Sequence, residues 1–184
     1  DAFARLQDFV ARQTGMKIET FNGEFESAVP RIIEFVRAGG SSNFSFVFID
    51  PTGWTGFGMK TIAPLLRLTP SEVLINFMTG HIRRFVETQG TTESFVDLFG
   101  VPNTGDLVAG LGGEDRDDAL VQLYCQNVKT TGGFDFAIPA IVLEPLEDRP
   151  HFHLIYCTRS DKGIEVFKDA EKRASDAVRM RKDL

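Results

Sequence analysis

The segment from Asp50 to Gly58 combines residue types that could bind or orient a small molecule. It follows an apolar run at 44–49, FSFVFI, so Asp50 comes at the end of an expected buried strand. In open α/β sheets, ligands bind beyond the carboxyl ends of the strands. Asp50 would direct a carboxylate there, Pro51 would stiffen the turn, and Trp54 offers a flat face for stacking a ring. A tight turn in which Asp50 only caps the next segment is the alternative.

The glycines of this segment allow a ligand to approach the backbone closely, and they suggest a second chemistry. Gly53, Gly58 and Lys60 nearly match the phosphate-binding loop of nucleoside triphosphatases. That loop needs its lysine directly after the last glycine, whereas Met59 intervenes here and turns Lys60 by about 100° around the helix. A nucleotide-binding, NTPase-like protein is therefore the weakest of the alternatives.

Three basic side chains follow a second apolar run at 73–78, VLINFM. His81, Arg83 and Arg84 come at the same expected edge of the sheet, where they could contact the phosphates of a nucleic-acid substrate. A solvated helix face explains them equally well.

The remaining histidines and both cysteines predict no metal site. His151 and His153 share one face of a later strand, but the sequence supplies no third ligand for zinc, so surface or cross-strand histidines are expected. Cys125 and Cys157 lie far apart among apolar neighbours. We expect them to be buried thiols rather than a disulfide or part of a zinc site.

Helices and strands alternate along the chain, which predicts a single α/β domain over 1–184. We expect strands near 17–22, 44–50 and 72–78 to be parallel neighbours, and strands at 134–143 and 151–158 to form an antiparallel hairpin. The expected helices lie at 2–14, 26–38, 59–68, 114–129 and 161–182. The glycine-rich stretch 80–113, with short helical pieces, is expected to be an insertion or lid.

Composition limits the class of protein. The net charge of −6 excludes a wholly basic surface for nucleic acid, although a local basic patch is compatible with it. The sequence has neither an apolar run of membrane-spanning length nor an opening secretory signal, so we expect a cytoplasmic protein that does not enter membranes.

Three blocks together resemble the three-Cys-motif partner protein family: FVFIDPTGWTGFGMK at 46–60, VLINFMTGHIRRF at 73–85 and HLIYCTRSDKGIEVFK at 153–168. The resemblance implies a Rossmann-like domain of the class I methyltransferase type, whose last strand inserts antiparallel into the sheet. It also implies S-adenosyl-L-methionine as cofactor and a three-Cys-motif protein as partner.

The resemblance gives roles to the residues after the first buried strand. Asp50 and Pro51 match the position of the (Asp/Asn)-Pro-Pro-aromatic motif, in which the acid and a backbone carbonyl accept hydrogen bonds from a target amine. Asp50, Pro51 and Trp54 are therefore the expected catalytic residues. The match is incomplete, because Thr52 replaces the second proline, Gly53 replaces the aromatic residue, and Trp54 comes one place late.

The expected cofactor-binding residues are Glu24 and Phe25, together with Asp50. Glu24 and Phe25 follow the strand expected near 17–22, where methyltransferases use an acidic residue to read the adenine amino group. A helix-start carboxylate at Glu24 is an equal alternative. The first strand and the glycine-rich cofactor loop of such a domain would precede Asp1, so we expect residues 1–184 to be its later part.

Two functions follow from these observations. The first is an S-adenosylmethionine-dependent methyltransferase that acts on a nucleobase or another amine acceptor. The second is a non-catalytic Rossmann-like binding module that serves a three-Cys-motif protein.

Overall fold

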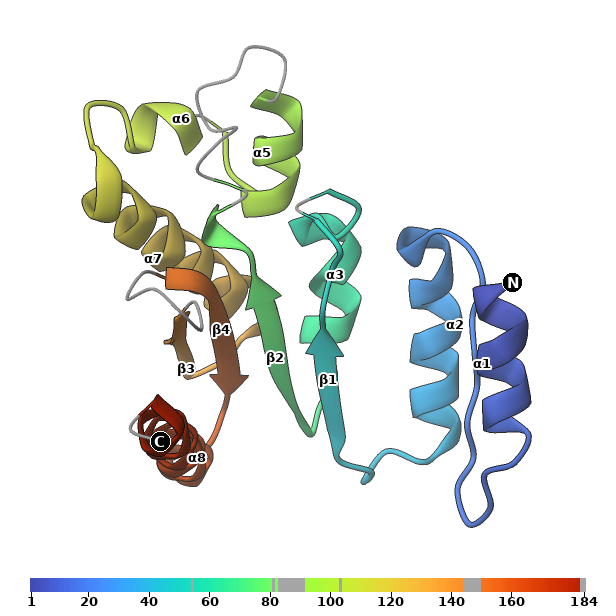
Figure 1. Cartoon of the computed structure of the whole chain (residues 1–184). Helices are drawn as coiled ribbons and strands as arrows, with labels where there is room; N and C mark the ends of the chain where they lie inside the picture. The colour runs from blue at the N-terminus through green and yellow to red at the C-terminus, as the bar shows by residue number, and fades with distance from the viewer. Residues whose placement is uncertain (54, 81, 83–91, 103, 144–149, 183–184) are drawn as a thin grey trace.

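The computed structural model describes residues 1–53, 55–80, 82, 92–102, 104–143 and 150–182 (Figure 1). Trp54, His81, Arg83 and Arg84 lie outside this range. The helices are α1 (Ala2–Val10), α2 (Phe25–Ala38), α3 (Met59–Leu66), α5 (Thr92–Phe99), α6 (Thr104–Leu107), α7 (Gly113–Gly132) and α8 (Asp161–Lys182). The strands are β1 (Ser45–Ile49), β2 (Ser71–Phe77), β3 (Phe136–Leu143) and β4 (Pro150–Thr158).

The four strands form one open sheet in the order β1-β2-β4-β3. β1 and β2 are parallel, with Ile49 opposite Ile75, whereas β4 is antiparallel to both of its neighbours. The last strand in the sequence therefore lies between two earlier ones. The predicted parallel pair at 44–50 and 72–78 is confirmed, and so is the antiparallel hairpin.

One face of the sheet carries the main core. Val73, Ile75 and Phe77 alternate along β2 and are completely buried. They pack with side chains of α3, α5 and α7, including Tyr124, whose ring stacks on Phe77 with centroids 4.4 Å apart. The predicted buried thiols, Cys125 and Cys157, belong to this core, and both are free.

Helix α8 packs against the opposite face of the sheet. Cys157 points into the core, so its neighbour Tyr156 points to the other side of β4. There the Tyr156 ring stacks on Phe167 of α8, with centroids 4.5 Å apart. Gly163 allows this close approach, because a Cβ atom there would lie 2.8 Å from the Tyr156 hydroxyl and would require a side chain to shift.

The stretch 80–113, expected to be an insertion or lid, contributes α5 and α6 in its described parts. Both helices lie beyond the end of β2 (Figure 1). Phe95, Leu98 and Phe99 of α5 are almost completely buried in the main core, where Phe99 meets the edge of the Phe77 ring. Helix α5 is therefore part of the packed domain.

The prediction of a strand near 17–22 is wrong. These residues follow α1 without pairing to any strand among the described residues. Their side chains contact α2 instead: the Lys17 ammonium lies 4.8 Å from the centre of the Phe35 ring, and Arg31 stacks on Phe21. Helix α2 in turn packs on α3 through a small core of its own, formed by Val29, Ile33, Leu65 and Leu68.

Arg159, which follows β4, joins three elements at the opposite end of the sheet from Asp50. Its guanidinium donates hydrogen bonds to the carbonyl oxygens of Gly132 (2.6 Å), Gly133 and Leu66 (both 3.0 Å). It also lies over the Phe134 ring, 4.2 Å from the centroid. The ends of α3 and α7 are thereby fixed to the sheet, because one rigid guanidinium satisfies their last carbonyl groups.

Strand β1 forms one edge of the sheet, and large apolar side chains on the strand and directly before it are exposed. Phe44, Phe46 and Phe48 are 59%, 56% and 53% exposed. Exposed aromatic side chains in a row, beside an edge that pairs with no other described strand, are unusual for a surface that faces only water. Among the described helices, none has the length and apolar character needed to cross a bilayer.

Candidate functional site

Asp50 lies at the carboxyl end of β1, directly after the buried Ile49. Its side chain is exposed, and its Oδ1 atom accepts a hydrogen bond of 2.8 Å from Nδ2 of Asn76. The register of the two strands explains this contact. Because Ile49 is opposite Ile75, Asp50 lies opposite Asn76. Among the described residues, no hydrogen-bond donor is found for the other carboxylate oxygen, Oδ2.

Asn76 was not among the residues singled out from the sequence. It is half-buried. Its side-chain carbonyl oxygen, Oδ1, is buried without a hydrogen-bond partner in the described part of the chain. The sequence does contain a signal for it, because Asn76 is the one polar residue in the run VLINFM at 73–78. A lone amide in a buried strand indicates a specific polar contact.

The loop after Asp50 is tied to the core and to two helices. Phe57 is 2% exposed and belongs to the main core. A Cβ atom on Gly58 would clash with the carboxylate of Asp97 on α5, so this side chain fills the space beside the glycine. The expectation that glycine here gives room to a ligand is therefore wrong at Gly58, where it gives room to Asp97.

The first turn of α2 reaches the same loop. Glu26 lies beside Gly56, since a Cβ atom on that glycine would come within 3.5 Å of Glu26 Oε1. Glu24 occupies the N-cap position of α2, where it is exposed and makes no side-chain capping bond. Phe25 is half-buried and packs against both cores. Glu24 and Phe25 thus lie at the carboxyl end of the sheet, although they begin a helix rather than end a strand.

A buried polar pair joins β4 to the residues that follow β2. Nδ1 of His153 lies 2.6 Å from Oγ1 of Thr79, and both residues are almost inaccessible to solvent. Burial lowers the pKa of His153, and the charge of Asp118 on α7 opposes that effect. The ring is therefore neutral near pH 7 and can form a hydrogen bond with Thr79 in either tautomer.

His151, the neighbour of this pair on the same strand, is exposed and lies against the ring of Phe152. Within the described ranges, histidine, cysteine, aspartate and glutamate side chains form no group of three that could hold a metal ion.

Lys60 lines a hollow of about 430 Å³ at the start of α3. Glu93 and Asp97 of α5 line the same hollow. Two carboxylates beside one ammonium group make the hollow unfavourable for a phosphate, because like charges repel in a partly desolvated site.

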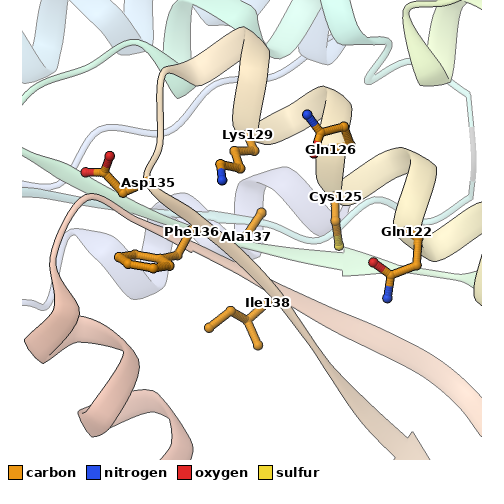
Figure 2. A pocket seen from close by; sticks show the side chains of 8 residues that line it. All are labelled: Gln122, Cys125, Gln126, Lys129, Asp135, Phe136, Ala137 and Ile138. Atoms are coloured by element: carbon orange, nitrogen blue, oxygen red, sulfur yellow. The ribbon is translucent and has the colours of Figure 1, made fainter.

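A second hollow, of about 220 Å³, lies between α7 and the start of β3 (Figure 2). It is lined by Gln122, Cys125, Gln126, Lys129, Asp135, Phe136, Ala137 and Ile138. β3 runs in the same direction as β2, because both are antiparallel to β4, so its first residues lie at the opposite edge from Asp50. Burial raises the pKa of Cys125 to about 12, which keeps the thiol protonated and weakly nucleophilic.

Comparison of the chain with protein-family models, with curated proteins and with solved structures finds no match. The geometry around Asp50 therefore provides the main basis for a functional assignment. It combines an exposed carboxylate held by an amide, a proline-stiffened turn and the first turn of α2, all at the carboxyl end of a parallel pair of strands.

Proposed function

We propose that this chain belongs to a Rossmann-like, S-adenosylmethionine-dependent methyltransferase, in which Asp50 orients an acceptor amine. The observation that carries the proposal is the position of Asp50 and Pro51 directly after β1, in a sheet whose last strand lies antiparallel between its neighbours. The resemblance to the three-Cys-motif partner family, found in the sequence blocks around Asp50, implies this same combination.

The strand order supports the assignment. In the common Rossmann order 3-2-1-4-5-6, strand 1 lies beside strand 4, and ligands bind at the switch point between them. If β1 and β2 are strands 4 and 5, strand 1 pairs with the free edge of β1. That position would account for the edge of β1 that pairs with no other described strand. It also puts Asp50 at the switch point.

The residues present fit an amine acceptor. Oδ2 of Asp50 can accept an N–H of the target amine, which holds the nitrogen in place and directs its lone pair away from the carboxylate. The nitrogen becomes more positive as it takes up a methyl group, and the carboxylate stabilises that charge. S-adenosylmethionine supplies the methyl group when it is bound. Glu24 and Phe25 would hold its adenine, with the Glu24 carboxylate accepting from the amino group.

A non-catalytic binding module is the second candidate. Thr52 and Gly53 replace the proline and the aromatic residue that amino-methyltransferases place after Asp-Pro, and this departure favours binding without turnover. Such a module would serve a three-Cys-motif protein. An NTPase-like function is disfavoured by the carboxylates of Glu93 and Asp97 beside Lys60.

Calorimetric titration of the natural full-length protein separates these functions. The proposal predicts heat of binding with S-adenosylmethionine or its demethylated product, and a far weaker response to ATP. Transfer of tritiated methyl groups from S-adenosylmethionine to an oligonucleotide would then distinguish an enzyme from a non-catalytic binding module. Tight binding of ATP that is lost in Lys60→Ala, without a response to S-adenosylmethionine, would contradict the proposal.

A further inference from the structure

Asn76 occupies a position that favours an apolar side chain. Its neighbours on the same face of the sheet are Leu74, two residues earlier on β2, and Leu154, which lies opposite on β4, and both are half-buried. The side-chain oxygen of Asn76, Oδ1, is buried and has no hydrogen-bond partner among the described residues. An orphaned buried acceptor lowers stability, since it loses its bonds to water and gains none in return. Packing alone therefore does not explain an asparagine here.

The side-chain amide of Asn76 donates a hydrogen bond to the expected catalytic acid. Nδ2 donates to Oδ1 of Asp50 over 2.8 Å. Asp50 is exposed, so without this bond its carboxylate would sample several rotamers. The bond comes from a residue inside the sheet, and a central strand is a rigid support. One oxygen of Asp50 is thereby fixed, and Oδ2 is directed to a definite place.

We propose that Asn76 is a positioning residue for Asp50, kept at this site at the expense of stability. The inference rests on the proposed function, because it gives the fixed carboxylate an acceptor amine to orient. It goes beyond that function by assigning a role to a residue on the neighbouring strand. Residues that reduce stability without a packing reason are found mainly at functional sites. Asn76 is such a residue, because its buried side-chain oxygen has no hydrogen-bond partner in the described structure.

The test replaces the amide by an apolar side chain of similar size. Asn76→Leu in the full-length protein should raise the Tm or leave it unchanged, because the orphaned acceptor disappears. Turnover of tritiated S-adenosylmethionine on a synthetic oligonucleotide containing adenine and cytosine should fall by about 10- to 100-fold in kcat, as is typical when a reacting group is misplaced. Affinity for S-adenosylmethionine should stay the same.

A matched control uses the same face of the same strand. Leu74 lies two residues before Asn76, is also half-buried and lies outside the site. Leu74→Ala should lower the Tm and leave kcat unchanged. A fall in Tm together with kcat in Asn76→Leu would make Asn76 a structural residue and overturn the inference.

A double substitution tests whether Asn76 acts through Asp50. Adding Asn76→Leu to Asp50→Ala should cause no further loss of turnover, because the group that Asn76 positions is already absent. A further tenfold loss would show an independent role and contradict the proposal.

A spectroscopic measurement keeps the inference separate from the proposed function. The side-chain amide signal of Asn76 in a ¹⁵N–¹H spectrum should shift upfield in Asp50→Ala, where its acceptor is lost. This measurement needs neither cofactor nor acceptor. If the unsubstituted protein transfers no methyl groups, the proposed function fails. The amide signal and the Tm of Asn76→Leu then still show whether Asn76 positions Asp50. An unchanged signal would overturn it.

Discussion

Nδ1 of His153 lies 2.6 Å from Oγ1 of Thr79, and this contact joins β4 to the residues that follow β2. The histidine is 3% exposed and the threonine 2%. Burial lowers the pKa of His153 below its ordinary value of 6.5, so the folded protein prefers the neutral ring. The burial of His153 therefore makes the stability of the fold sensitive to acid.

The first prediction concerns this sensitivity. Below about pH 6.5 the unfolded chain binds a proton at His153 more readily than the folded chain does, so stability is lost as the pH falls through that value. His153→Gln removes the titrating group. Its Tm should decrease less between pH 7.5 and 5.5 than that of the unsubstituted protein, as measured by scanning calorimetry. Parallel Tm curves for the two proteins would rule out His153 as a source of the acid sensitivity.

The second prediction concerns Arg159. Arg159→Lys keeps the charge and loses the planar fork that bonds to Gly132, Gly133 and Leu66. We expect the free energy of unfolding to fall by about 2–4 kcal/mol in urea titrations, since hydrogen bonds to charged groups contribute about 1.5–3 kcal/mol each. Arg67 provides a nearby control, because it is exposed and donates one hydrogen bond to Thr131. Arg67→Lys should cost less than about 1 kcal/mol, and an equal loss in both variants would argue against a special role for Arg159.

The third prediction concerns the exposed edge of the sheet. Residues 1–184 should self-associate through β1, because Phe46 and Phe48 are exposed beside an edge that pairs with no other strand in the described ranges. Phe46→Lys should reduce the association, measured by sedimentation velocity, with little change in Tm. Val166 on α8 is exposed to a similar degree, 58%, and lies away from that edge. If Val166→Lys reduces the association as much as Phe46→Lys, the β1 edge is not the contact.

The sequence was sufficient to predict the parallel pair and the hairpin, because uninterrupted apolar runs such as FSFVFI have few other stable placements. It failed at 17–22, where the alternating pattern of Met16, Ile18 and Thr20 resembles a strand. A strand needs a partner, and the residues near Phe21 contact Arg31 of α2 instead. Local periodicity does not reveal whether a pairing edge is available.

For the candidate site, the sequence predicted the position of Asp50 and missed its partner. Asp50 follows an apolar run directly, so its place at the end of β1 depends on local pattern alone. The contact with Asn76 depends on the register between β1 and β2, and the Thr79–His153 pair depends on β4 lying next to β2. Both contacts join residues far apart in the sequence.

The role of Asp50 is the central claim. Asp50→Ala removes the carboxylate, and losing one charge-stabilising contact in the transition state costs about 2–4 kcal/mol, or on the order of a hundredfold in rate or more. Asp50→Asn keeps the shape and much of the hydrogen-bonding capacity, so its effect should be milder. Affinity for S-adenosylmethionine should be retained in both variants.

The most direct measurement combines thermal unfolding and methyl transfer on one preparation of full-length Asp50→Ala, with the unsubstituted protein beside it. The account predicts that turnover nearly disappears while the Tm changes little. If Asp50 only caps the next segment, stability should fall by about 1 kcal/mol and turnover should be unaffected. A folded Asp50→Ala protein with unchanged turnover would remove Asp50 from the site and contradict the account.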